Sequence, residues 1–320
     1  MVDYTYLENT LLPARFMVKM SGIDTENVRL MEKQNQMEQI SLDAKRSAIV
    51  QTKKWVFSRG LRDNGFAGFG MANEMALAKA GEVLFSKEFI IELYRKMTAG
   101  DALNECYRTS EWNGEIHRVY PVTPDKIDEK LQEICDAYQA AAVNRDIHPI
   151  LLDACVLQDF ILLAPFEKGN HLLAELIARY LLLERGYDVV MYRPCRMDEN
   201  NQTVLRLVRD ADAEWGSDKI SIPFLEHILY QLADAYRNQE AQLIAIKETR
   251  VLKRERIEAV IMGSNAPITK EEICERLPDV SETTIEVQLA VMCKKGQIAR
   301  LGTRRNSVYV KRDWEAKKDD

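Results

Sequence analysis

The chain has 320 residues, of which 46% are hydrophobic and 29% charged, and its formal net charge is −6. These values are ordinary for a globular protein with room for two or three domains, and they exclude a polycationic nucleic-acid-binding protein. The six cysteines lack metal-ligand spacing, and no apolar run reaches the roughly 20 residues that span a bilayer. We therefore expect a protein of the reducing cytoplasm, with no metal site, no disulfide and no membrane partner.

The first 70 residues predict one long polar helix over 24–58, because Asp24 and Thr25 are good helix caps. The glycine-rich run 60–70 follows a helix instead of a strand and lacks the order G-x-G-x-x-G. It is therefore expected to be a flexible connector, not a phosphate-binding loop. Two helices are expected between 71 and 99, separated near Gly81.

A hairpin signal comes next. Trp112, Asn113 and Gly114 lie in a run of strand character, and the Asn-Gly pair favours a two-residue β-turn in which both positions have positive φ. A helix is expected to follow from Thr123 or Asp125 to Ala142.

Two segments, 149–163 and 172–185, are apolar on nearly every side. Helices of this kind lie in the middle of a bundle. The second ends at Gly186, a typical residue just beyond a helix C-terminus. Two further helices are expected over 203–210 and 222–246.

The last 70 residues change character. Helices are expected over 253–262, 269–276 and 281–295, followed by strands over 297–301 and 307–311. Three helices and a hairpin in this order are typical of a winged helix-turn-helix. The expected domains are therefore an N-terminal helical segment, a helical domain and a winged helix-turn-helix domain, over 1–70, 71–250 and 251–320.

The loop between the two apolar helices reads Ala164-Pro165-Phe166-Glu167-Lys168-Gly169-Asn170-His171, and Leu172-Leu173-Ala174-Glu175 follows. This run resembles the motif H-P-F-x-[DE]-G-N-G-R-x-x-R of the Fic family (filamentation induced by cAMP). It keeps the proline, the phenylalanine, the first glycine and the asparagine of that motif. The order of a hairpin flap, a helix and then the motif is also similar to the family. The resemblance implies a mainly α protein, in which a Fic-fold helical bundle with a β-hairpin flap precedes the winged helix-turn-helix domain.

In the family, the motif histidine takes a proton from a target hydroxyl, which attacks the α-phosphate of ATP. Ala164 at that position cannot accept a proton, and losing a positioned base typically costs about 10²- to 10⁴-fold in rate. The family acid that helps to hold Mg²⁺ is replaced by Lys168, and the two arginines are replaced by Leu172 and Glu175. We therefore expect no efficient AMP transfer and name no catalytic residue, with ATP and Mg²⁺ as cofactors only if the site is active.

Two interpretations of the loop stay open. Lys168, Gly169, Asn170 and His171 could bind a nucleotide or another anion at the helix N-terminus, or the glycine and asparagine could simply form the turn and cap the helix. His171 as a displaced base, with Glu167 as the metal-binding acid, would make a rearranged active centre. In that case the protein would be a protein adenylyltransferase.

The C-terminal residues suggest a nucleic-acid partner. Between Lys294 and Arg312 the chain has seven basic residues and no acidic one. The expected DNA-contacting residues lie on the third helix and on the wing: Ser281, Thr283, Thr284, Gln288, Arg300, Arg304 and Arg305.

Three functions are compatible with the sequence. The first is a Fic-fold pseudoenzyme that acts in signalling or regulation by binding DNA or a partner protein. The second is an active nucleotidyl or phosphoryl transferase with a rearranged site. The third is a protein-binding scaffold, in which the flap around Trp112, Asn113 and Gly114 docks the target.

Overall fold

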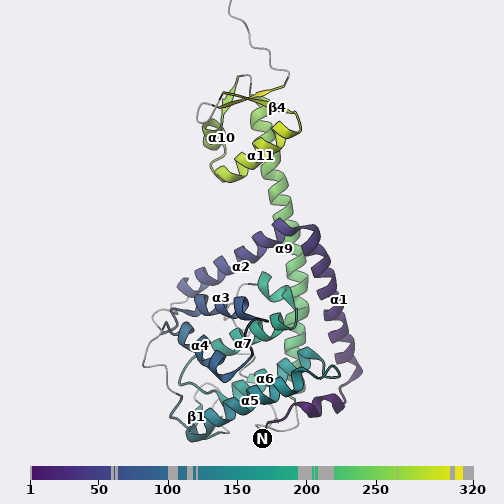
Figure 1. Cartoon of the computed structure of the whole chain (residues 1–320), viewed down its shortest axis with the longest axis vertical. Coiled ribbons are helices and arrows are strands. Elements are labelled where there is room, and N and C mark those ends of the chain that lie inside the picture. Colours follow the sequence, from purple (N-terminus) through teal and green to yellow (C-terminus); the bar gives the residue numbers. More distant parts are fainter. Residues whose placement is uncertain are drawn as a thin grey trace, which may run out of the picture. The chain divides into compact units, whose positions relative to one another are not determined.

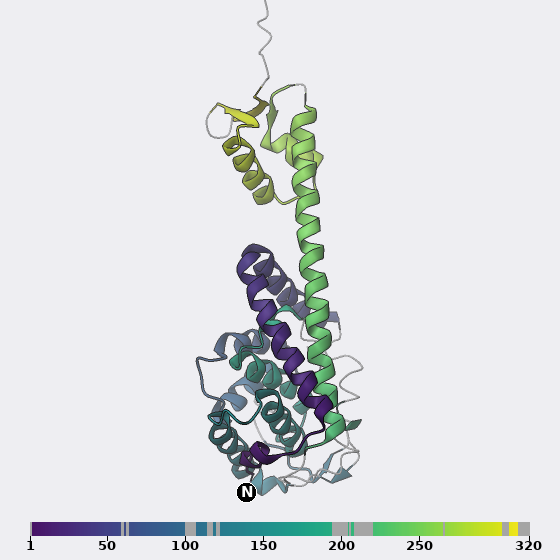
Figure 2. The same cartoon turned by 90° about the vertical axis from the view of Figure 1, so that its right-hand side faces the viewer.

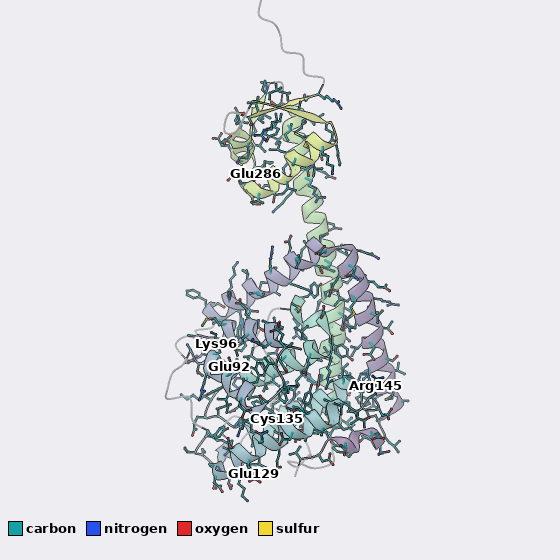
Figure 3. All side chains as sticks on the ribbon, in the orientation of Figure 1. Glu92, Lys96, Glu129, Cys135, Arg145 and Glu286 are labelled. Carbon is teal, nitrogen blue, oxygen red and sulfur yellow. The ribbon has the colours of Figure 1, made fainter. Side chains whose placement is uncertain are left out.

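The computed structural model describes most of the chain, and its side chains are drawn in Figure 3. The described residues are 2–58, 61, 64–99, 107–113, 118–119, 122–193, 204, 206–207, 220–264, 266–302 and 307–312. They form two compact units, Met1–Gln242 and Leu243–Asp320. Cys135 is buried in the first unit, and Glu286 lies on a helix of the second (Figure 3).

The N-terminal region contains the short helix η1 (Thr5–Asn9) and the helices α1 (Ala14–Gln36) and α2 (Glu38–Ser58). The prediction of a single helix over 24–58 is therefore wrong in two respects: the helix begins earlier, and it is interrupted at Met37. The chain becomes helical directly after Pro13, and Met37 leaves the helical conformation with φ −130° and ψ 44°. Asp24 and Thr25 do not cap a helix, because both lie within α1; the Asp24 carboxylate accepts a hydrogen bond from the Tyr187 hydroxyl at 2.7 Å.

The next helices agree with the sequence pattern. α3 (Phe69–Lys79) and α4 (Lys87–Met97) are separated at Gly81, which has a positive φ. Ser86 caps α4 by accepting a hydrogen bond from the backbone N–H of Phe89. The short helix η3 (Pro124–Lys126) then leads into α5 (Ile127–Ala142).

The two apolar segments form α6 (Pro149–Leu163) and α7 (Asn170–Glu184), which contact each other and lie among the helices of the first unit (Figure 1). All residues of α6 from Ile150 to Leu163 are buried. α7 ends at a turn where Gly186 has φ +82°, and η4 (Asp188–Tyr192) packs back onto it. These two helices are the frame that holds the loop 164–169.

The hairpin is present, but its turn differs from the expectation. β1 (Trp112–Asn113) pairs with β2 (Arg118–Val119), with Trp112 opposite Val119 and Asn113 opposite Arg118. A two-residue Asn113-Gly114 turn would have placed Trp112 opposite Glu115, so that prediction is wrong. Asn113 belongs to the strand, and Gly114 lies outside the described residues.

The helices expected over 222–246 and 253–262 are one helix, α9 (Ile222–Gly263). The intervening residues contain neither glycine nor proline, so nothing in the backbone chemistry ends the helix there. Its first part lies beside α1 in the first unit (Figure 2), where Lys19 pairs with Glu226 and Lys33 with Glu240. Most of the helix expected over 203–210 lies outside the described residues.

The second unit has the helices and strands that the sequence predicts, with one more strand. β3 (Ile268–Thr269), α10 (Lys270–Arg276), α11 (Glu282–Lys294), β4 (Ile298–Leu301) and β5 (Val308–Lys311) follow the end of α9. The sheet is antiparallel in the order β3-β5-β4. One apolar core unites these elements with α9, through Ile257, Ile261, Ile268, Ile273, Leu277, Val280, Ile285, Leu289, Met292 and Ile298.

No helix in the described part of the chain is both long and apolar enough to cross a lipid bilayer.

Candidate functional site

The motif loop, residues 164–169, joins the buried ends of α6 and α7. Ala164 ends α6 in the left-handed conformation, with φ 42° and ψ 68°, and only 3% of its surface is exposed. Its N–H donates to the Phe160 carbonyl at 2.9 Å. Ala164, which the resemblance aligns with the family base, has only a buried methyl group that can neither accept nor donate a proton.

Arg108 is a residue of this site that the sequence analysis missed. It is 1% exposed, and its guanidinium donates to the carbonyls of Ala164 at 3.0 Å and Val122 at 2.5 Å, with a longer contact to Leu163 at 3.3 Å. Its own N–H donates to the Pro165 carbonyl at 2.9 Å. A cation at the C-terminal end of α6 is favoured by the helix dipole, so Arg108 fixes the start of the loop.

Gly169 and Asn170 shape the other end of the loop. Gly169 has φ +74°, and a Cβ there would lie 2.5 Å from the ring of Phe66, so only glycine fits without displacement. Asn170 is 8% exposed; its Oδ1 accepts from the Phe166 N–H at 2.9 Å and its Nδ2 donates to the Phe166 carbonyl at 2.6 Å. These bonds close the turn between Phe166 and Asn170, whereas no side chain of the described residues caps the N-terminus of α7.

Glu167 is exposed but engaged. Its Oε1 accepts hydrogen bonds from the backbone N–H of Thr109 at 2.5 Å and from the Thr109 hydroxyl at 2.9 Å. Tyr107 and Phe166 form an antiparallel bridge beside it. The carboxylate expected as a substitute metal ligand therefore ties the loop to the segment that leads into the flap.

Lys168 is the cationic residue of the loop. Its side chain is exposed, with no hydrogen bond or ion pair to a described residue, while its carbonyl accepts from the Tyr94 hydroxyl at 3.2 Å. The Tyr94 ring stacks on Phe166 at 3.7 Å between centroids. Burial, and secondarily the negative charge of Glu167, raises the pKa of Tyr94 to about 12, so its hydroxyl stays protonated as a donor.

His171 and Glu175 lie on one side of α7. Both are half-buried and line a hollow of about 60 Å³ whose other walls include Leu157 and Ile161. Leu172, at the position of the first family arginine, is 1% exposed and belongs to the core. The structure therefore brings Glu167 and Lys168 to the surface of the loop and places His171 against an apolar wall.

The described residues contain no group of three or more histidine, cysteine, aspartate or glutamate side chains that could hold a metal ion. Of the flap residues, Trp112 and Asn113 form β1, and Gly114 lies outside the described part of the chain.

The expected DNA-contacting residues of α11 divide into two groups. Ser281 caps the helix by accepting from the Thr284 N–H, and Thr283 is exposed beside it. Gln288 is only 3% exposed and donates to Glu258 at 2.7 Å. Gln288 is therefore unavailable to DNA, because it lies on the face of α11 that packs against α9.

The charged groups around α11 also have partners. Lys270 pairs with Glu282 at 2.5 Å and with Glu286 at 2.8 Å. Arg300 is exposed, and its guanidinium donates twice to the Ser307 hydroxyl, at 2.9 and 2.7 Å. Arg304 and Arg305 lie outside the described residues.

Comparison with solved structures places this architecture among known folds. A Fic-domain-containing signaling protein from Bacteroides thetaiotaomicron has a TM-score of 0.51 and 18% identity, covering 72% of this chain and 97% of that chain. A Fic family protein from Desulfovibrio desulfuricans has a TM-score of 0.52 and 15% identity, covering 96% of this chain and 98% of that chain. No protein-family model matches the sequence, and no curated protein matches it. At such identities the likeness concerns the fold alone, and the conclusion is that this chain has the Fic fold.

Proposed function

We propose that this Fic-fold protein does not transfer AMP and acts in signalling or regulation by binding a partner through its C-terminal unit. The observation that carries the first half is Ala164, a buried methyl group where the family chemistry needs a base. Glu167, whose Oε1 accepts from Thr109, and Asn170, whose amide bonds to Phe166, support the same conclusion, because these contacts hold both side chains in the structure of the loop.

Labelled ATP tests this half. Purified protein with α-labelled ATP, Mg²⁺ and a cell extract is expected to transfer no label to itself or to another protein. The rival mechanism is an adenylyltransferase that uses His171 as the base, with Glu167 and Lys168 in new roles. Label transfer that disappears in His171→Ala would establish the rival and refute the proposal, whereas transfer unchanged by His171→Ala would refute both.

The second half concerns DNA. The order of elements in the C-terminal unit supports a winged helix-turn-helix, and Ser281 and Thr283 are exposed at the start of its third helix. Arg304 and Arg305 lie in the connection between β4 and β5, where phosphate contact is expected. Lys270 neutralises part of the charge of Glu282 and Glu286, which reduces their repulsion of phosphates.

Fluorescence anisotropy of a mixed-sequence DNA duplex at several salt concentrations tests this half. Each lost phosphate contact reduces the magnitude of the negative slope of log K against log salt by about 0.9. Arg304→Ala with Arg305→Ala is therefore expected to weaken binding and to reduce that slope by about 2. The matched control replaces Lys317 and Lys318, another basic pair, by alanine and is expected to change less. No DNA binding at low salt would leave protein docking at the flap or the C-terminal unit as the function.

A further inference from the structure

A second hollow lies further along α7 than the motif loop. It has a volume of about 100 Å³ and lies between α7, η4 and the first part of α9, within the first unit. Arg179, which lines it, follows Asn170 by nine residues, or about 14 Å along a helix. Most of the wall is apolar, formed by Ala178, Leu182, Val189, Val190, Ile228, Leu232 and Ala235.

Three basic side chains line this hollow: Arg179, Arg193 and His227. Arg179 is 4% exposed, and it donates to the carbonyls of Val190 at 2.6 Å and Arg193 at 3.0 Å. Arg193 donates to Oε1 of Gln231 at 3.1 Å. Neither arginine forms an ion pair with any residue in the described part of the chain.

The described residues that line the hollow carry more basic than acidic groups. Glu175 is the one acidic side chain among the described residues that line the hollow, and it also lines the neighbouring hollow beside His171. A buried guanidinium that bonds only to neutral carbonyls leaves much of its desolvation cost uncompensated, and a counter-ion would offset it. Burial, and secondarily the positive charge of the nearby Arg193, lowers the pKa of His227.

We propose that this hollow binds a small organic anion, a carboxylate with a compact apolar body. The carboxylate would lie against Arg193 and the edge of Arg179, because guanidinium groups bind carboxylates in planar, two-point contacts. The apolar body would contact Leu182, Ile228 and Leu232. The hollow is smaller than the roughly 150 Å³ cavity known to hold benzene, so the apolar body is no larger than a single ring. This site is separate from the motif loop and does not rest on the function proposed above.

Benzoate is the probe, and benzamide is the uncharged molecule of the same shape. Titration calorimetry and thermal unfolding of the full chain at constant ionic strength are expected to show saturable benzoate binding, with a midpoint at or below about 10 mM. Benzamide is expected to bind at least tenfold more weakly. Equal binding of the two, or no saturable binding of benzoate, would refute the proposal.

Variants locate the binding. Arg193→Gln is expected to weaken benzoate at least tenfold, while Arg193→Lys, which keeps the charge, retains part of the affinity. Arg237→Gln removes an exposed arginine from the same helix, α9, and is expected to change nothing. Ile228→Phe fills the hollow without changing charge and is expected to abolish binding even if Arg193→Gln is unstable. Benzoate binding that survives both Arg193→Gln and Ile228→Phe would place the anion elsewhere and overturn the proposal.

Discussion

Asp153, in the middle of α6, has a buried carboxyl group, and burying the charged form of a carboxyl group costs free energy. It is 1% exposed, and neither of its carboxyl oxygens has a hydrogen-bond partner among the described residues. Burial raises its pKa to about 8, although the positive charge of Arg185 opposes this shift and Glu184 adds to it. The group is therefore mostly neutral at pH 7, unlike an aspartate in water.

The pH dependence of stability follows from this shift. Below about pH 4 the carboxyl is protonated in both the folded and the unfolded chain. As the pH rises from there to about 8, the unfolded chain releases the proton and the folded chain retains it, so the free energy of unfolding falls. Relative to Asp153→Asn, the wild type should lose up to about 1.4 kcal/mol per pH unit in this interval.

Urea unfolding at several pH values checks this prediction. Asp136→Asn, at an exposed position of α5, controls for the loss of one negative charge. If the difference in stability between wild type and Asp153→Asn does not vary with pH, the carboxyl is not held neutral by the fold.

Arg108 is the second residue-scale test, because its guanidinium joins three segments at the motif loop. Arg108→Leu removes the donor to the carbonyls of Ala164 and Val122 and leaves these buried acceptors without it. We expect a loss of at least about 2 kcal/mol in the free energy of unfolding, since each buried unsatisfied group costs about 1–3 kcal/mol. The exposed Arg237→Leu, measured by the same denaturant titration, should change stability by less than about 0.5 kcal/mol.

At the scale of elements, α10 and α11 are joined by the pairs from Lys270 to Glu282 and Glu286. Both glutamates are largely exposed, so the pairs contribute little to stability. The pairs instead affect the electrostatic potential at the exposed face of α11, because Lys270→Ala leaves the carboxylates of Glu282 and Glu286 without a positive partner there. If α11 approaches DNA, this variant should weaken duplex binding by severalfold in the anisotropy assay, and Glu282→Gln with Glu286→Gln should strengthen it. Opposite changes would show that α11 does not face phosphates.

At the scale of the whole molecule, the two compact units have separate apolar cores although α9 contributes to both. Ile285 is fully buried in the core of the C-terminal unit. Ile285→Ala should destabilise that unit by about 2–5 kcal/mol. Hydrogen exchange should become faster in α10, α11 and the sheet and remain unchanged in α6 and α7. Faster exchange in α6 and α7 would indicate that the two units unfold together.

Much of this architecture could be predicted from the sequence, because its signals are local. The apolar runs of α6 and α7, the Gly-Asn pair before α7 and the caps Ser86 and Ser281 are consecutive or near neighbours in the chain. The alignment of Ala164 with the motif base likewise rests on consecutive residues of the sequence. Local periodicity and residue chemistry determine such features without reference to distant residues.

Other features were decided only by tertiary structure. Arg108 lies in an irregular segment 56 residues before Ala164, and no local pattern distinguishes it from a surface arginine. Gln288 is polar and was expected to face DNA, yet packing against α9 buries it beside Glu258. Glu167 was considered as a substitute metal-binding acid, and its Oε1 accepts a hydrogen bond from Thr109. The sequence by itself therefore determined the central helices α6 and α7 and the glycine turn between them. Long-range contacts decided which polar groups are occupied, because a hydrogen-bond partner distant in the chain leaves no periodic signal.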